Sequence, residues 1–358
     1  LLSTGGGVIT DREKSEQQGE PTIIIGLGGT GIDALKVVKK KVYEQLYPDN
    51  PGGEIPKYEH IGFLAIDTDD ISNGEDIYSL RKNECLSIKV NGLVKKMEND
   101  IAHEYKEFDW LQKDLNQLRE EGAGMVRQIG RYCLFKNINE IKSKIKKLKD
   151  EVTQDAVPNV NVHIIAGISG GTGSGTFIDM CYIVRELLGT ASTLFGYFFM
   201  PDVNLSKEGV DTKGERRIKG NGYAALKELD YTMNLVNEGK TFSQYYGGEG
   251  GHSVKETSMP PVDLCHLISA REQNGVLIKN GYMYSMNIVG EYILSYLAKA
   301  EDYNGTALTL AGHLANVNSL VGATNKKHGE NLNYNILGAS VAELPTREVG
   351  TYLAAKLY

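Results

Sequence analysis

The sequence predicts an α/β fold in which a mainly parallel β-sheet lies between helices on both of its faces. Short β-branched or aromatic runs alternate with segments whose apolar residues recur at helical spacing. Two of these runs lead into glycine-rich loops, residues 26–31 and 167–176, and a helical segment follows each loop. Acidic residues follow a third run at 67–70. Because the carboxyl ends of parallel strands meet at one edge of a sheet, we expect the loops and the acids to gather there.

The composition is that of an ordinary globular protein, with 358 residues, 41% of them hydrophobic and 24% charged. A net charge of −7 argues against a general nucleic-acid or membrane-surface binder. No apolar run approaches the ~20 residues of a membrane-spanning helix, and no signal peptide is recognisable. We expect a cytoplasmic protein whose widely spaced cysteines are reduced core residues. These cysteines are Cys85, Cys133, Cys181 and Cys265.

Three parts are expected along the chain. Residues 1–20 are polar, lack periodicity and predict a flexible tail. Residues 21–300 contain the strand and helix segments and predict one nucleotide-binding domain, with a long helix at about 282–298. Residues 301–358 are expected to begin a C-terminal domain. Because the sequence starts without Met and stops within a helical pattern, we expect it to be a piece of a longer protein.

The first half of the chain predicts strands at 21–25 and 60–66, with a helix from 32 to about 47 between them. Residues 88–121 are amphipathic and charge-rich, which predicts a helix. Another helix follows Gly122 and Gly124. It carries Arg127 and Arg131 on one face, either as surface residues or as sensors of a terminal phosphate.

The second half begins with a strand at 160–166, which leads through the central glycine loop into a helix. Further strands are predicted at 193–200, 262–269 and 336–342. Helices are predicted at about 222–235, 282–298 and 347–358, whereas 242–261 is rich in Gly, Ser and Tyr and predicts an insertion loop.

Both glycine loops predict phosphate sites, because glycine lets backbone N–H groups approach a ligand and a helix N-terminus favours an anion. The central loop contains no Lys and is therefore not a Walker P-loop. The first loop matches the dinucleotide fingerprint at Gly26, Gly28 and Gly31. However, Asp67 lies 36 residues beyond Gly31, rather than ~20. Taken alone, this loop fits tight packing, an NAD site or another nucleotide site.

Taken together, these segments resemble the tubulin/FtsZ superfamily of GTPases. Gly-Gly-Thr-Gly-Ser-Gly-Thr at 170–176 is similar to its signature loop, and Phe-Leu-Ala-Ile-Asp-Thr-Asp at 63–69 is similar to the end of its second strand. Residues 26–31 and 122–124 resemble its first phosphate loop and its γ-phosphate loop. The order holds over about 21–298, and bacterial tubulin-like proteins are a nearer match than FtsZ or tubulin. The resemblance implies a Rossmann-like GTPase domain that binds GTP or GDP with Mg²⁺.

The resemblance also implies roles for individual residues. Asp33 and Asn287 would bind the guanine base, with Tyr282 or Tyr284 stacked on it. Arg217 would lie near the sugar and phosphates, and Asp69 would contact Mg²⁺ through water. The alternatives are that Asn287 is a surface amide and that Arg217 forms a surface salt bridge. The predicted nucleotide-binding set is Gly28, Gly29, Thr30, Gly31, Asp33, Asp67, Thr68, Asp69, Gly122, Ala123, Gly124, Gly170, Gly171, Thr172, Gly173, Ser174, Gly175, Thr176, Arg217, Tyr284 and Asn287.

In the superfamily an acidic loop of the neighbouring subunit completes hydrolysis. Its pattern, like Asn-x-Asp-x-x-Asp, is poorly matched after the long helix, where Glu301 and Asp302 are the catalytic candidates. The leading hypothesis is a GTP-binding protein that assembles head to tail into homo-oligomers or filaments. The alternatives are a non-polymerising nucleotide switch within a larger bacterial assembly of other proteins and an NAD-dependent oxidoreductase. No direct nucleic-acid partner and no membrane span are expected.

Overall fold

The computed structural model describes residues 21–46, 60–72, 74, 78–112, 122–153, 159–189, 192–247, 251–297, 334–337 and 356. The predicted tail, the catalytic candidates Glu301 and Asp302, and most of the predicted C-terminal domain lie outside these residues. Within the described ranges, no helix combines the length and the apolar character needed to cross a membrane.

Seven parallel strands form the central sheet, in the order β3-β2-β1-β4-β5-β8-β9. β1 and β4 lie side by side in its middle, and nearly all of their residues are buried. The predicted α/β fold with a parallel sheet is therefore confirmed, and β3 adds one strand to the six expected. The strands are β1 (Thr22–Leu27), β2 (Ile61–Asp67), β3 (Cys85–Ser87), β4 (Asn161–Gly167), β5 (Thr193–Phe199), β8 (Leu264–Ile268) and β9 (Asn335–Leu337).

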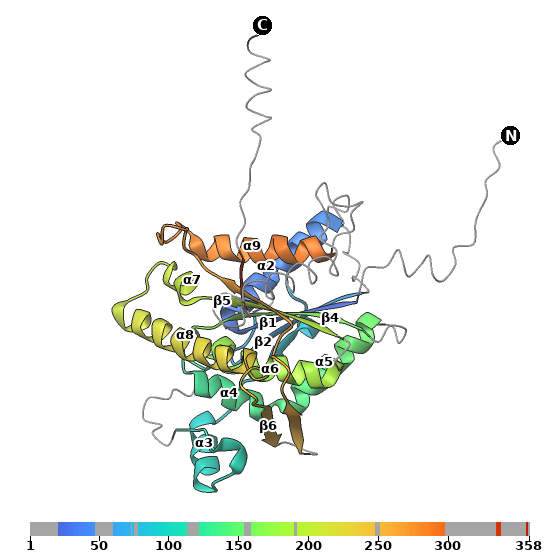
Figure 1. The fold of residues 1–358 in the computed structure, drawn as a ribbon, viewed down its shortest axis with the longest axis vertical. Coiled ribbons are helices and arrows are strands. Elements are labelled where there is room, and N and C mark those ends of the chain that lie inside the picture. Colours follow the sequence, from blue (N-terminus) through green and yellow to red (C-terminus); the bar gives the residue numbers. More distant parts are fainter. Residues whose placement is uncertain are drawn as a thin grey trace, which may run out of the picture.

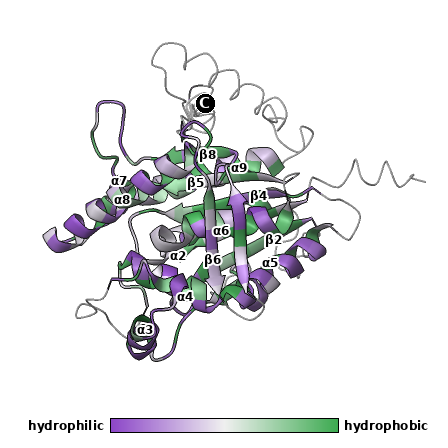
Figure 2. Cartoon of the chain, turned by 60° about the horizontal axis from the view of Figure 1, so that its bottom comes forward, coloured by the Kyte–Doolittle hydropathy of each residue, from purple (hydrophilic) through white to green (hydrophobic). Residues whose placement is uncertain are grey.

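Helices cover both faces of the sheet (Figure 1). On one face, α2 (Gly28–Leu46) and α9 (Gly281–Leu297) pack against each other and against alternate strand residues such as Ile24. The other face is covered by α4 (Arg127–Lys136), α5 (Ile138–Thr153), α6 (Thr172–Leu188) and α8 (Thr212–Met233), and here Ile23 and Ile25 face the helices. Figure 2 shows hydrophobic residues on the strands and hydrophilic ones along the outer turns of α3 (Leu93–Ala102) and α8.

The segment predicted as an insertion loop contains an antiparallel hairpin, β6 (Phe242–Gly247) and β7 (His252–Thr257). Tyr246 and Val254 are its buried anchors, and the polar residues between them hide the pattern of alternation. The hairpin corrects the loop prediction and forms one wall of a cavity described below.

Two further boundaries differ from the sequence prediction. α8 begins at Thr212, ten residues before the predicted start, because Asp211 caps it by accepting a hydrogen bond from the Gly214 N–H at 2.6 Å. Residues 88–121 were predicted as one helix, but only α3 and a 3₁₀ turn, Lys106–Phe108, are helical in the described part of that segment. The short α7 (Pro201–Leu205) follows β5 directly.

Candidate functional site

Both glycine loops open onto one cavity at the carboxyl edge of the sheet. α2 begins at Gly28 directly after β1, and α6 begins at Thr172 after β4. Because β1 and β4 are paired in register, the two helix N-termini meet. The cavity between them has a volume of about 250 Å³. It is lined by Leu27, Gly28, Gly29, Thr30, Asp67, Asp69, Ala123, Gly124, Met125, Gly167, Gly170, Gly171, Thr172 and Gly173.

This arrangement suits a polyphosphate. The first N–H groups of a helix have no partner within the helix, and the helix dipole adds partial positive charge there. Here two such termini face the same space from neighbouring strands. The cavity can therefore donate several backbone hydrogen bonds to phosphate oxygens without any lysine in either loop.

The glycines around the cavity are of two kinds. A Cβ added to Gly29, Gly124 or Gly170 would meet no atom within 4 Å, and all three residues line the cavity. By contrast, a Cβ on Gly31 would lie 2.4 Å from the Ile165 carbonyl oxygen. The first kind keeps the cavity open to a ligand, whereas the second allows close packing of the backbone.

A chain of hydrogen bonds joins three segments below the cavity. The Ala123 N–H donates to Thr68 Oγ1 at 3.0 Å, and Thr68 Oγ1 lies 2.7 Å from Thr172 Oγ1. The Thr172 hydroxyl donates to Asp67 Oδ1 at 2.7 Å, which leaves Thr68 as the donor to Thr172. The chain therefore runs in one direction, from an amide to a carboxylate. Burial raises the pKa of Asp67, while the hydrogen bonds from Thr172 and from the Thr68 N–H oppose that shift.

The 122–124 loop contacts Asp69, an exposed residue two positions after the end of β2. Gly122 has φ +58°, which favours glycine, and a Cβ there would lie 2.0 Å from Asp69 Oδ1, so a larger residue would strain the backbone and displace the Asp69 carboxylate. Asp67 and Asp69 place two carboxylates at the cavity. Among the described residues, no group of three or more His, Cys, Asp or Glu could hold a metal ion by itself.

Three residues of the predicted phosphate loop lie away from this cavity. The Ser174 hydroxyl donates to the Ile168 carbonyl at 2.7 Å, and the Thr176 hydroxyl donates to the Thr172 carbonyl at 2.8 Å. Gly175 packs against the backbone of Arg127. The Ser174 and Thr176 hydroxyls therefore hold the loop and α6 together, and neither residue lines this cavity.

Arg127 and Arg131 both face α6 and form ion pairs. Arg127 Nε donates to Ser174 Oγ at 2.8 Å, and its guanidinium also pairs with Glu228 of α8. Arg131 forms a bidentate pair with Asp179 at 2.8 and 3.1 Å. Both arginines are partly exposed, and neither lines the cavity between α2 and α6.

Asn221 of α8 also holds the loops, although no sequence motif includes it. Its side-chain amide donates to the carbonyls of Met125 at 2.9 Å, Ser169 at 3.1 Å and Gly170 at 3.2 Å. α8 therefore contacts both the 122–124 loop region and the central glycine loop. An amide in a charged helix carries no motif signal, which is why sequence reasoning missed it.

Beside the first loop, Asp33 accepts a hydrogen bond from Tyr282 Oη at 2.7 Å. Burial and this bond raise the pKa of Tyr282. Lys207 Nζ lies 3.8 Å from the centre of the Tyr282 ring, and the pKa of Lys207 is lowered by burial, with the charge of Asp33 opposing. By contrast, Tyr284 and Asn287 are exposed on α9. The Asn287 amide donates to the Met283 carbonyl at 3.0 Å.

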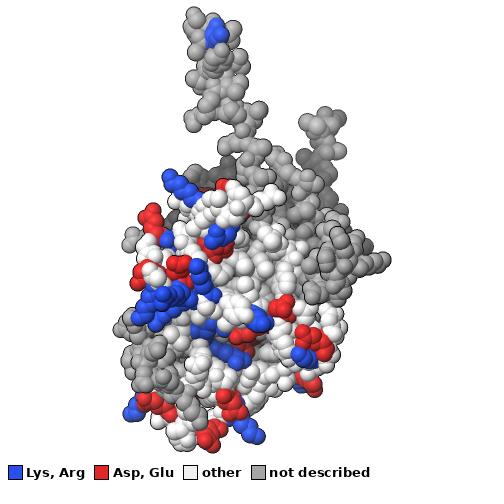
Figure 3. Space-filling view, turned by 60° about the vertical axis from the view of Figure 1, so that its left-hand side comes forward, with Lys and Arg blue, Asp and Glu red and all other residues white. Residues whose placement is uncertain are grey.

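Arg217 lies beside the 122–124 loop. Together with Lys213 it lines a cavity of about 430 Å³, whose other walls include Gly122, Ala123 and Gly124. Figure 3 shows Lys and Arg side chains gathered on the face that carries α7 and α8. The structure thus brings Arg217 close to the loop but does not place it in the cavity between α2 and α6.

The sequence matches a family model described as "Tubulin like" over residues 23–358. No curated protein matches it. Similar solved structures include CetZ from Methanosaeta thermophila, at 14% identity and TM-score 0.47, over 84% of this chain and 59% of that chain. An empty FtsZ dimer of M. jannaschii matches at 13% identity and TM-score 0.42, over 85% and 62% of the two chains. A GTPγS-form protofilament of Bacillus thuringiensis serovar israelensis TubZ matches at 13% identity and TM-score 0.40, over 78% of this chain and 57% of that chain. The chain thus spans less than two thirds of the length of each of these three proteins.

Proposed function

The chain belongs to the tubulin-like family, and we propose that it binds GTP and GDP with the phosphates in the cavity between α2 and α6. The observation that carries this proposal is the meeting of two helix N-termini at one cavity, on the paired strands β1 and β4. Gly28 to Gly31 would bind one part of the polyphosphate through backbone N–H groups, and Gly170 to Gly173 the other. An NAD site would leave the second glycine loop without a role.

Magnesium fits the acidic side of the cavity. Carboxylate oxygens are the protein ligands Mg²⁺ prefers, and it keeps several waters and phosphate oxygens as its other ligands. Asp69 would hold the ion through water, with Asp67 fixed behind it by Thr172. When bound, Mg²⁺ supplies charge neutralisation to the phosphates. Two carboxylates suffice because the nucleotide provides the remaining ligands.

Asp33 supports a preference for guanine. Its carboxylate can accept hydrogen bonds from guanine N1–H and N2–H, whereas adenine offers no donor at N1. Tyr282 holds Asp33 in place through its 2.7 Å hydrogen bond. Tyr284 and Asn287 remain proposed base contacts from α9, and Arg217 a proposed contact near the sugar and phosphates.

Beyond nucleotide binding, we infer head-to-tail self-assembly in the cytoplasm, with GTP hydrolysis completed by the neighbouring subunit. The contact would be heterologous, and such contacts extend into filaments when the rotation does not close. Glu301 and Asp302 are the residues proposed to reach the neighbouring phosphate. Tubulin-like family membership favours this form of the proposal over a non-polymerising nucleotide switch.

The decisive experiment measures nucleotide directly. The purified protein is denatured, released nucleotide is identified by chromatography, and GTP, ATP and NAD are titrated with Mg²⁺. GTP or GDP alone is expected, and pelleting with GTP then tests assembly. Binding of NAD in preference to GTP would refute the proposal.

A matched pair of variants tests the base contact. Asp33→Ala should weaken GTP binding roughly tenfold to a hundredfold, the size of losing hydrogen bonds to a charged group, and should leave ATP binding unchanged. Asp70→Ala is the control, because it also removes one carboxylate, but from an exposed residue that pairs with Lys89 instead of with Tyr282. Equal effects of the two variants on GTP binding would exclude Asp33 as the base-binding residue.

A further inference from the structure

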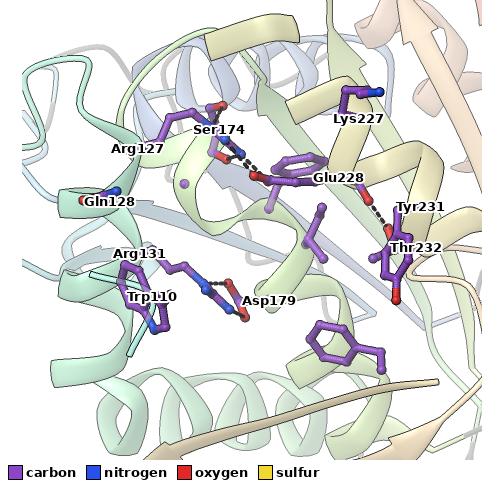
Figure 4. A pocket seen from close by; sticks show the side chains of 14 residues that line it. Trp110, Arg127, Gln128, Arg131, Ser174, Asp179, Lys227, Glu228, Tyr231 and Thr232 are labelled. Atoms are coloured by element: carbon purple, nitrogen blue, oxygen red, sulfur yellow. Dashed lines mark hydrogen bonds and ion pairs between the residues drawn. The ribbon is translucent and has the colours of Figure 1, made fainter. Parts of the chain in front are cut away.

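A second cavity lies behind the central glycine loop, between α4, α6, α8 and β6. Its volume is about 550 Å³, within the ~300–1,000 Å³ of small-molecule sites. Figure 4 shows the side chains that surround it. Ser174 and Gly175 belong to its wall, whereas Gly170 to Gly173 line the phosphate cavity. The first turn of α6 therefore separates the two cavities.

Apolar side chains form much of the wall, and they are held in place. Phe242 stacks on Tyr182 with ring centres 3.9 Å apart. The Trp110 indole N–H donates to the Glu107 carbonyl at 2.7 Å, and the Arg131 guanidinium lies 4.6 Å from the Trp110 ring. The cavity is therefore preformed. The apolar and aromatic lining residues are Trp110, Phe177, Ile178, Tyr231 and Phe242.

Four of the five charged side chains at the cavity compensate one another in two ion pairs. The fifth, Lys227, is exposed, and its Nζ lies 5.9 Å from the centre of the Tyr223 ring, which does not line the cavity. Asp179 is paired with Arg131, and Glu228 is paired with Arg127 across the space between α4 and α8 (Figure 4). An occupant with its own charge would lose hydration without gaining a partner from these pairs. Ring faces and neutralised pairs therefore favour an aromatic molecule without net charge.

The same side chains connect this cavity to the phosphate loop. Arg127 binds both Ser174, in the loop, and Glu228, on the cavity rim. Two turns before Glu228 on α8, Asn221 donates to the carbonyls of Ser169 and Gly170. A molecule that shifts α8 must therefore shift contacts of the phosphate loop as well.

We propose that this cavity is a regulatory site for a planar aromatic molecule without net charge, and that its occupancy changes nucleotide affinity through α8 and Arg127. The binding step is independent of any nucleotide. The regulatory step rests on the proposed function, because it requires GTP or GDP in the phosphate cavity. Affinity coupling between two sites is reciprocal, so each ligand must change the Kd of the other ligand by the same factor.

The binding step is tested with the neutral naphthalene dye prodan, followed by its fluorescence. One saturable site is expected per chain. Ile178→Trp, which fills the cavity, and Tyr231→Ala, which removes a wall, should each weaken binding at least tenfold. The matched control is Tyr223→Ala, on the same helix and 67% exposed but not lining the cavity. Circular dichroism confirms folding, and if Ile178→Trp does not fold, the two tyrosine variants decide. No saturable binding, or equal binding to the Tyr231 and Tyr223 variants, overturns the proposal.

The regulatory step is tested by titrating GTP with and without saturating prodan. Saturating prodan should change the Kd for GTP at least threefold, and saturating GTP should change the Kd for prodan by the same factor. The variant Asn221→Ala should abolish both changes. An unchanged Kd for GTP overturns the regulatory role. If GTP fails to bind at all while prodan follows the variants, the proposed function fails and the second binding site stands.

Discussion

The two glycine loops have similar sequences but different surroundings. The first, at the start of α2, lies on the face of the sheet covered by α9, and its Thr30 hydroxyl donates to Asn204 Oδ1 at 3.2 Å and also interacts with Tyr282. The second, at the start of α6, is tied by hydrogen bonds to Asp67, Thr68 and the 122–124 loop. The two loops touch where Gly28 meets Gly173, since a Cβ on Gly28 would lie 2.6 Å from the Gly173 nitrogen. The second loop is thus the one that connects the site to the rest of the protein.

The comparison teaches that a glycine in such a loop has one of two separate roles. In the first loop Gly29 faces the cavity, and the missing Cβ of Gly31 lets backbone segments pack closely. In the second loop Gly170 faces the cavity, and Gly173 has the packing role. Stability and binding should therefore respond to different substitutions.

The largest effect is expected for Gly31→Ala. Its Cβ would lie 2.4 Å from the Ile165 carbonyl oxygen in the central strand β4, where the backbone cannot move aside. Overpacking of this kind should lower the free energy of unfolding by about 3 kcal/mol or more. Urea unfolding followed by circular dichroism measures it. A loss below about 1 kcal/mol, at the low end of overpacking costs, would contradict the packing role.

Gly29→Ala and Gly170→Ala should separate binding from folding. A methyl group in the cavity should remove at least one charge-assisted hydrogen bond to phosphate, about 2 kcal/mol or roughly thirtyfold in Kd for GTP. The free energy of unfolding should stay within about 0.5 kcal/mol of the wild type, as for other strain-free substitutions. Gly220→Ala is the control, because its Cβ also meets no atom but lies on α8 outside the cavity. Equal GTP affinity in the three variants would refute the division of roles.

The strands behind the loops also differ in that β4 carries a buried titratable residue, His163, at the position paired with Ile24 of β1. Complete burial lowers the pKa of His163 from 6.5 to about 3. His163 is therefore neutral in the folded protein, whereas in the unfolded chain it is protonated below pH 6.5. Because the unfolded chain then binds a proton that the folded protein does not, the free energy of unfolding is unaffected by His163 above pH 6.5 and falls as the pH drops from 6.5 toward 3. At pH 5 the loss should be about 2 kcal/mol relative to pH 7. Urea unfolding at both pH values should show this extra loss in the wild type and not in His163→Gln.

The smallest effects are expected from the loop hydroxyls. Thr172→Val breaks a buried hydrogen-bond chain and should cost about 1.5 kcal/mol. Thr30→Val should cost about 0.5 kcal/mol, because the Thr30 bond to Asn204 is longer and Thr30 itself is less buried than Thr172. Thermal unfolding of the two variants measures the difference. The reverse order would show that the first loop is the better anchored of the two.

Sequence reasoning predicted the elements that combine strong apolar periodicity with glycine punctuation. β1, β4, α2, α6 and α9 are of this kind, and their order places the loops at one edge of the sheet. The hairpin β6–β7 was missed because its strands are polar on the exposed face and short. The first ten residues of α8 were missed because they lack an apolar stripe, and a cap from Asp211 begins the helix instead.

At the site, sequence reasoning predicted the loops and the strand-end acids, but not which way individual side chains point. Ser174 and Thr176 were expected at the phosphates, yet inside a helix their hydroxyls turn to carbonyls of the preceding residues. Asn221 depends on the approach of α8 to two loops, which only the tertiary structure determines. Glu301 and Asp302 stay predictions, since they lie outside the described residues.

The pairing of β1 with β4 also bears on how the protein is made. Ile24 and His163 are neighbours in the sheet although 139 residues separate them in the chain. Closing so long a loop is slow, and sheets built from distant segments fold on the millisecond-to-second scale or slower. During synthesis on the ribosome, the first glycine loop cannot form the site until the second glycine loop has emerged. Nucleotide added during refolding should therefore bind only late, after the central strands β1 and β4 have paired.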